Sequence, residues 1–100
     1  MFGDNGRAVY GKNLIAHGRK DVATAGTRVT LAPDENGATG VYIKALAGNT
    51  DTIYVGGLTV TSANGYPLAA GEKLYLPIAS TATIYLDSAV SGEGVAYFII

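Results

Sequence analysis

The sequence of 100 residues contains no cysteine and no tryptophan, and its only histidine is His17. Without cysteine, neither disulfides nor thiolate metal ligands hold the fold together. With one histidine, a transition-metal site would depend on carboxylates alone, so we expect no metal and no cofactor. A catalytic nucleophile needs a neighbouring base, and His17 stands in a glycine-rich stretch. We therefore expect that the protein is not an enzyme.

Charged residues and long apolar runs are also scarce. Only 15% of the residues are charged, and the formal net charge is −1. This charge gives no reason to expect nucleic acid as a partner. No run approaches the roughly 20 apolar residues of a membrane helix, and the first residues lack the apolar centre of a signal peptide. We expect no membrane association and synthesis in a cytoplasm.

The few charges are unevenly distributed along the chain. Residues 1–28 hold five basic and two acidic side chains, a balance of +3, whereas residues 29–100 hold two basic and six acidic ones, a balance of −4. Such asymmetry can orient a subunit against its neighbours or a partner. Chance in a short chain explains it equally well.

Short runs in which apolar and polar residues alternate make up most of the chain. Glycine, asparagine and proline separate these runs, which are rich in β-branched residues and tyrosine, as in antiparallel β-structure. No window has a helical period. We predict an all-β fold, an antiparallel two-sheet sandwich or jelly roll of about seven or eight short strands. The expected strands are residues 22–25, 27–32, 41–47, 52–55, 58–61, 73–78, 82–87 and 94–100.

The first 21 residues differ from the remainder in composition. They contain four glycines and little alternation, so we predict an extended N-terminal arm over residues 1–21 and a single β-sandwich domain over residues 22–100. We expect the positive charge of the arm to dock on an acidic partner surface. The basic residues predicted to dock are Arg7, Lys12, Arg19 and Lys20.

The phase of the alternation predicts the core. One set of aliphatic residues shares the inward phase of the expected strands. This set is Val29, Leu31, Val41, Ile43, Ile53, Val55, Leu74, Leu76, Ile84, Leu86, Val95 and Ile99.

Tyrosines occupy the opposite phase on four strands, and we expect them to share one face. Cross-strand pairs on a solvated sheet, a protein interface and a platform for sugars each explain such a face. The last strand is apolar on both sides, so it is either central in a covered sheet or part of an interface. The predicted oligomer or partner contacts are Tyr42, Tyr54, Tyr75, Tyr85, Phe98 and Ile100.

Three segments carry a resemblance to a known group of proteins. They are ALAGNTDTIYVGG at residues 45–57, TSANGYPLAAGEKLYLP at residues 61–77 and TIYLDSAVSGEGVAY at residues 83–97. The chain resembles small β-rich structural proteins of tailed bacteriophages, of the capsid decoration (cement) or head-fibre type. In those proteins the Asn-Gly-Tyr-Pro-Leu loop lies between strands, and Gly-Glu-Gly-Val precedes the last strand.

The resemblance implies a function without catalysis. It implies a decoration protein on the surface of the virion capsid, made in the host cytoplasm, that binds and stabilises the lattice of the major capsid protein. It further implies a homo-oligomer, with a trimer preferred, and a partner-docking role for the loop at Tyr66 and Pro67. A carbohydrate-binding or host-adhesion module, and a phage tail or connector component, stay open as alternatives.

Overall fold

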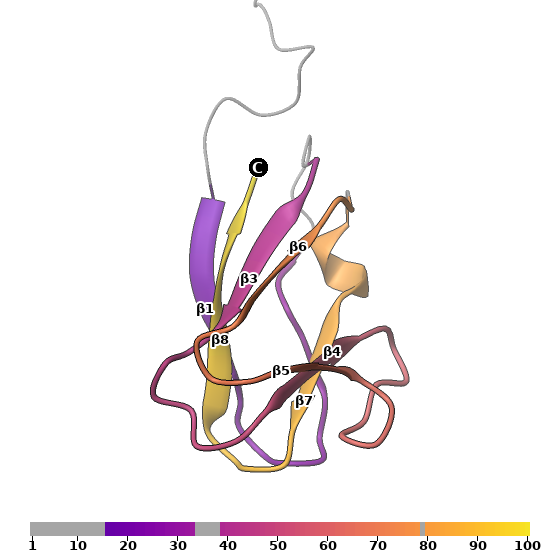
Figure 1. The fold of residues 1–100 in the computed structure, drawn as a ribbon. Coiled ribbons are helices and arrows are strands. Elements are labelled where there is room, and N and C mark those ends of the chain that lie inside the picture. The colour runs from indigo at the N-terminus through magenta and orange to yellow at the C-terminus, as the bar shows by residue number, and fades with distance from the viewer. Residues whose placement is uncertain (1–15, 34–38, 79) are drawn as a thin grey trace, which may run out of the picture.

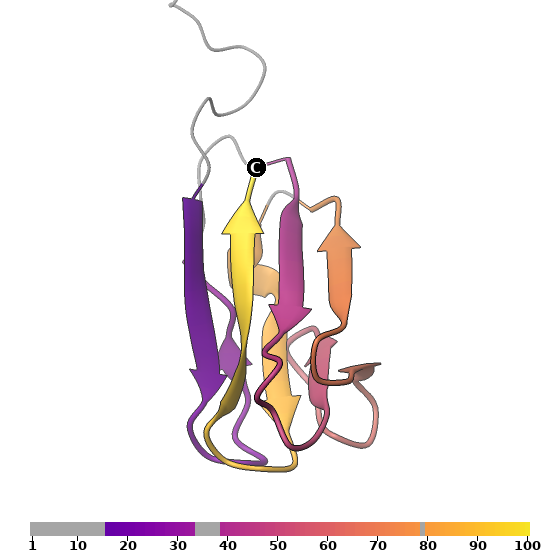
Figure 2. The same cartoon turned by 60° about the vertical axis from the view of Figure 1, so that its left-hand side comes forward.

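The computed structural model describes residues 16–33, 39–78 and 80–100. These residues form two four-stranded antiparallel sheets that face each other as a β-sandwich (Figures 1 and 2). The predicted all-β, two-sheet fold is therefore confirmed.

The first sheet has the strand order β1-β8-β3-β6. Strand β8 is internal because it pairs with both β1 and β3, as Figure 2 shows from the side of this sheet. The last strand is thus internal in its sheet, but the outer side of the sheet is not covered there, since Phe98 is 41% exposed; the predicted interface stays a prediction. The bounds of the strands are Ala16–Val22 for β1, Glu93–Ile99 for β8, Val41–Ala45 for β3 and Lys73–Leu76 for β6.

The second sheet has the order β2-β7-β4-β5, and a single turn of 3₁₀ helix, η1, precedes β7. The edge position of β5 explains how it tolerates a proline, because an edge strand needs fewer backbone donors. The bounds are Val29–Thr30 for β2, Tyr85–Ser88 for β7, Ile53–Gly56 for β4, Tyr66–Leu68 for β5 and Thr81–Thr83 for η1.

The core lies between the two sheets and follows the predicted phase. Strand β3 shows this most clearly, since its residues are alternately buried and exposed along its whole length. Nine of the twelve predicted core residues are buried, and Val29, Leu74 and Leu76 are partly buried against the same cluster. Val22 and Leu68 complete the core from strands whose inward phase the sequence did not reveal.

The arm predicted for residues 1–21 needs correction. Residues 16–21 belong to β1, which pairs with β8 from Ala16 opposite Ile99 to Val22 opposite Glu93. Gly18 has a packing role in this strand. A Cβ atom at this position would overlap the ring of Tyr97. The remainder of the predicted arm, residues 1–15, lies outside the described residues.

The strand predicted at residues 58–61 is also wrong. The chain turns there instead, with the backbone N–H of Val60 donating to the carbonyl of Gly57 at 3.1 Å. The side chain of Asn64 then accepts a hydrogen bond from the backbone N–H of Thr61 at 2.7 Å. Such local bonds compete with strand pairing. The buried Val60 satisfies the apolar pattern without forming a strand.

Two further boundaries differ from the predictions. The break expected at Tyr66 and Pro67 is strand β5, paired with β4. The strand expected from residue 82 begins only at Tyr85, because η1 comes first. The hydroxyl of Thr81 in η1 donates to the carbonyl of Pro33 at 2.5 Å, which holds this turn against the segment after β2.

Candidate functional site

A row of aromatic side chains crosses the outer side of the β1-β8-β3-β6 sheet. Register places Phe98 of β8 opposite Tyr42 of β3, and Tyr42 opposite Tyr75 of β6. On the other side of β8, His17 of β1 lies opposite Phe98. We call these four residues the aromatic row. Each strand of the sheet contributes one member.

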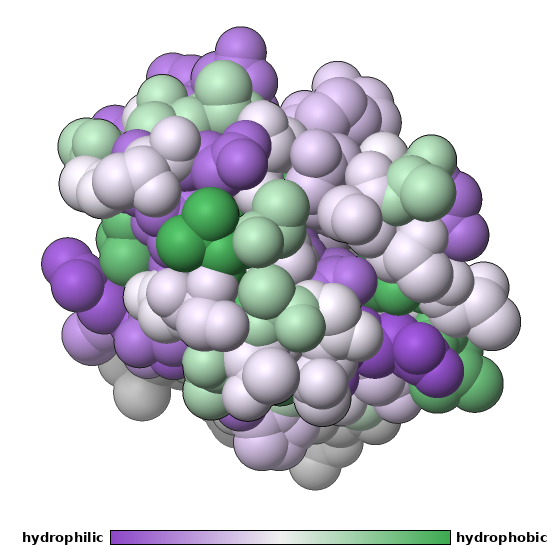
Figure 3. Space-filling view, turned by 90° about the horizontal axis from the view of Figure 1, so that it is seen from below, coloured by the Kyte–Doolittle hydropathy of each residue, from purple (hydrophilic) through white to green (hydrophobic). Residues whose placement is uncertain are grey.

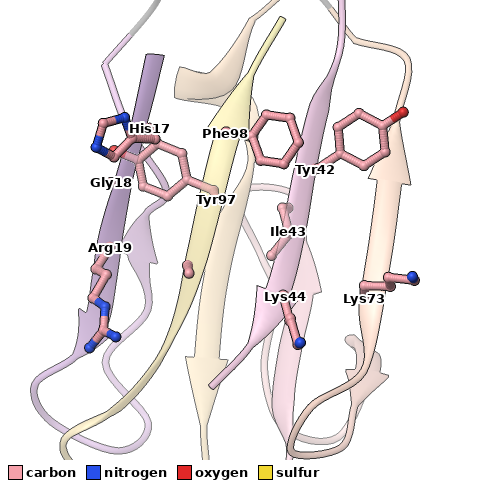
Figure 4. Close-up of a pocket in the computed structure, with 10 residues that line it drawn as sticks. His17, Gly18, Arg19, Tyr42, Ile43, Lys44, Lys73, Tyr97 and Phe98 are labelled. Carbon is pink, nitrogen blue, oxygen red and sulfur yellow. The ribbon is translucent and has the colours of Figure 1, made fainter. Parts of the chain in front are cut away.

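Three rings of the aromatic row, those of Phe98, Tyr42 and Tyr75, form a chain of contacts. The ring centroids of Tyr42 and Phe98 are 4.9 Å apart with nearly parallel planes, and those of Tyr42 and Tyr75 are 4.6 Å apart. Figure 4 shows that the rings of Phe98 and Tyr42 both extend from their strands toward β6. These three rings therefore form a continuous apolar strip and not a set of separate rings.

This strip is open to solvent. Phe98, Tyr42 and Tyr75 keep 41%, 40% and 42% of their surface exposed, so no described part of the chain covers them. Gly40 helps to position the last ring, because a Cβ atom at Gly40 would overlap the ring of Tyr75. The backbone of β3 thus gives Tyr75 room to lie close to the sheet.

A second row lies two residues away from the aromatic row on each strand, and three of its four side chains are basic. Register places Arg19 of β1 opposite Ala96 of β8, Ala96 opposite Lys44 of β3, and Lys44 opposite Lys73 of β6. We call these four residues the basic row, and the two rows together the aromatic face. Within the described part of the chain, no acidic side chain forms an ion pair with Arg19, Lys44 or Lys73.

The two rows border an open groove of about 630 Å³. The small side chain of Ala96 also lines the groove, and the register places it between the longer side chains of Arg19 and Lys44. Phe98 and Tyr42 line it on the side of the aromatic row. The groove thus combines apolar and positively charged walls.

The four predicted tyrosines do not share one face, which corrects that prediction. Tyr42 and Tyr75 lie on the first sheet, whereas Tyr54 and Tyr85 lie on strands β4 and β7 of the second sheet. The phase of a residue shows whether it lies on the inner or the outer side of its own sheet, but not which sheet its strand belongs to. The outer sides of the two sheets of a sandwich face in opposite directions. Tyr54 and Tyr85 are half-buried.

Loops partly cover the outer side of the second sheet. The backbone N–H of Gly26 donates to Oδ1 of the buried Asp87 at 3.0 Å, which brings the loop after β1 onto β7. Gly65, in the loop before β5, packs on the Cβ atom of Tyr54. This side is therefore less available to a partner than the aromatic face.

The remaining predicted contact residues are dispersed. Ile100 follows β8 and is half-buried, with its backbone N–H donating to the carbonyl of Gly40 at 3.0 Å. Tyr66 and Pro67 are exposed on β5, at the edge of the other sheet. The fold does not bring these residues to the aromatic face.

The predicted basic residues are divided in the same way. Arg19 is exposed on β1 and belongs to the aromatic face, whereas Lys20 is the next residue and has the opposite phase. Arg7 and Lys12 lie outside the described residues.

Each of the four buried polar side chains in the described part of the chain has a hydrogen-bond partner within the fold. The described residues contain no group of three or more His, Cys, Asp or Glu side chains placed to hold a metal. Glu93, which is buried, accepts hydrogen bonds from the hydroxyl and the backbone N–H of Thr50 and from the N–H of Asp51. The hydroxyl of Thr50 is the largest of the causes that lower the pKa of Glu93 below its ordinary value of 4.5. The charged carboxylate therefore serves to hold a loop.

The end of the sandwich opposite the C-terminus offers no comparable surface. Figure 3, which views this end, shows small apolar areas scattered among polar residues. Among the described residues, no helix has the length and apolar character needed to span a membrane.

Sequence reasoning did not select four members of the aromatic face, namely His17, Lys44, Lys73 and Ala96. A signal was present, because each strand of this sheet carries its row members two residues apart, as in Tyr42 and Lys44 or Lys73 and Tyr75. Residues two apart on a strand share a face. The missing information was which strands are neighbours.

Comparisons with protein-family models, curated proteins and solved structures found no match to this chain.

Proposed function

We propose that this protein is a bacteriophage virion structural protein, a decoration protein that docks on the lattice of the major capsid protein through its aromatic face. The observation that carries the docking role is the row of three exposed rings in mutual contact, from Phe98 across Tyr42 to Tyr75. The resemblance of the sequence to small phage structural proteins supports the choice of a capsid as the assembly.

The energetic argument for docking rests on apolar area. Burying apolar surface contributes roughly 25 cal/mol per Å², and contiguous exposed apolar areas mark interaction sites more often than isolated residues do. Tyrosine and phenylalanine are enriched in the centres of protein interfaces. Three adjacent rings at about 40% exposure form such a centre.

The mechanism requires no catalysis. A protein that binds the assembled shell and not its separated subunits shifts the equilibrium toward assembly by mass action. A flat sheet face supported by a packed sandwich suits this role, because its side chains are held in place before binding. The described residues provide such a face and no metal cluster.

The proposal includes a homotrimer at a three-fold position of the shell. Self-association would bury further apolar surface of a small, weakly charged subunit. The exposed Tyr66, which lies away from the aromatic face, is available for contacts between copies.

Co-sedimentation with capsids tests the proposal. Purified protein is mixed with shells assembled from the major capsid protein encoded in the same phage genome, and the pelleted protein is measured. We expect saturable binding, which Tyr42→Ser weakens strongly and Leu58→Ser leaves unchanged. Absence of wild-type protein from the pellet overturns the proposal.

A glycan array, probed in parallel, addresses the carbohydrate alternative. Saturable glycan binding that Tyr42→Ser abolishes, without capsid binding, identifies an adhesion module. Binding to tails in place of heads identifies a tail or connector component.

A further inference from the structure

The basic row has an arrangement that costs the free protein stability. Lys44 and Lys73 stand directly opposite each other on β3 and β6, with no described acidic side chain paired to either. Like charges at directly opposed positions of neighbouring strands are destabilising. A negatively charged group placed over the two lysines would remove this repulsion.

The basic row also crosses most of the sheet. Arg19 on β1 and Lys44 on β3 flank β8, which contributes only Ala96 to the row. The hollow over Ala96 is bordered by Phe98 and by both cations. An apolar side chain fits the hollow, and acidic groups beside it reach the cations.

The charge of the whole molecule favours a protein segment over a nucleic acid as the occupant. Proteins that bind single strands stack successive bases on aromatic side chains along a positively charged groove, and they depend on attraction of the phosphate backbone. The formal net charge is −1, so the whole molecule does not attract a dense polyanion.

We infer that the aromatic face receives an acidic segment of a partner protein. One apolar side chain of this segment occupies the hollow over Ala96 and packs on Phe98 and Tyr42. Neighbouring carboxylates pair with Arg19, Lys44 and Lys73. This inference rests on the proposed function for the protein nature of the partner, and it adds the chemistry of the segment.

Selection from a random peptide display library on the immobilised full chain tests the inference. We expect the selected peptides to combine Asp or Glu with a large apolar residue. Their affinity should fall about tenfold with Lys44→Glu and on raising the salt from about 0.05 M to about 0.5 M. Arg28→Glu is the matched control, since Arg28 is exposed in the loop after β1 and should change affinity less than about twofold.

Two more variants separate docking from folding. Lys73→Gln should weaken peptide binding while the melting temperature stays the same or rises, because the repulsion with Lys44 is removed. Ala96→Leu fills the hollow at a half-buried surface position and should weaken binding of the same peptides, with the sheet signal in circular dichroism unchanged.

Several results overturn the inference. Selected peptides without acidic residues, affinity unaffected by Lys44→Glu, or failure to enrich any peptide each exclude an acidic segment at this face. Saturable binding of an oligothymidylate, lost in Lys44→Glu, identifies a nucleic-acid face instead.

The capsid experiment distinguishes this inference from the proposed function. If the wild-type and Lys44→Glu proteins bind capsids equally, the decoration role is supported and an acidic segment at the aromatic face is excluded. If the protein binds acidic peptides but does not bind capsids, the acidic segment is supported and the decoration role is excluded.

Discussion

Glu93, the first residue of β8, accepts hydrogen bonds from both the hydroxyl and the backbone N–H of Thr50 in the loop before β4. A further bond from the N–H of Asp51, at 2.9 Å, completes the contact. One carboxylate thus connects the internal strand of the first sheet to the loop that leads into the second.

This contact predicts acid sensitivity. The hydrogen bonds of Thr50 lower the pKa of Glu93 in the folded protein below 4.5, the ordinary value that applies when the chain is unfolded. The unfolded state therefore binds the proton more readily, and this contribution to stability, present above about pH 4.5, is lost as the pH falls through the folded pKa. Urea unfolding at a series of pH values measures the effect.

Substitution of the Glu93 carboxylate measures its contribution to the stability of the fold. Glu93→Gln should lower stability at neutral pH and flatten the acid dependence below about pH 4.5. Glu72→Gln makes the same chemical change at an exposed residue and should do neither to the same extent. Equal acid dependence in wild type and Glu93→Gln would contradict the role of this contact.

Truncation of the core at Ile43 should be costly. Ile43 is 1% exposed in the middle of β3, between β8 and β6, so Ile43→Ala leaves a cavity. The expected loss in free energy of unfolding is about 2–5 kcal/mol, measured by urea denaturation. Leu58→Ala removes similar atoms from a side chain that is 62% exposed and should cost less than about 0.5 kcal/mol. A small effect at Ile43 would show that the sandwich can close around the gap.

The space over Gly40 predicts a change in the aromatic row. Gly40→Ala places a Cβ atom where the ring of Tyr75 lies, so the ring must move, at an expected cost below about 1 kcal/mol because the displaced atoms are the far end of an exposed side chain. Ring resonances of Tyr75 in NMR spectra report the movement directly. Gly48→Ala is the control, because a Cβ atom there meets no other atom within 4 Å. Unchanged Tyr75 resonances in Gly40→Ala would place the ring elsewhere.

Self-association follows from the proposed trimer and is measured by sedimentation velocity. We expect the wild-type protein to sediment as a closed oligomer, and Tyr66→Ser to shift it toward the monomer with the circular dichroism unchanged. Thr59→Ser, a conservative change at an exposed residue of the loop that precedes β5, should have no effect. A wild-type protein that stays monomeric at high concentration and on the shell removes the trimer from the proposal.

The alternation of apolar residues was sufficient to predict the fold class and most of the core, because period-two patterns record which side of each strand is buried. Strand β3 is the clearest case, with Val41, Ile43 and Ala45 all buried. Edge strands were harder to predict. β1 pairs along only one edge and contains Gly18, so its composition resembles that of a loop.

The aromatic face could be predicted only in part. Tyr42 and Tyr75 were selected from their phase and Phe98 from the apolar last strand, but Tyr54 and Tyr85 have the same phase as Tyr42 and lie on the other sheet. Phase is a local property, whereas the neighbours of a strand depend on topology. The pairing of Lys44 with Lys73 likewise required the register of β3 and β6.

The place of β8 between β1 and β3 has a consequence for biosynthesis. This strand, Glu93–Ile99, is synthesised after all the other described strands, yet both of its neighbours depend on it for backbone partners. Contacts between segments so distant in sequence form late and favour slow folding. Until β8 has been synthesised, β1 therefore lacks the strand with which it pairs, and its unpaired edge is exposed to aggregation or to chaperones that shield such edges.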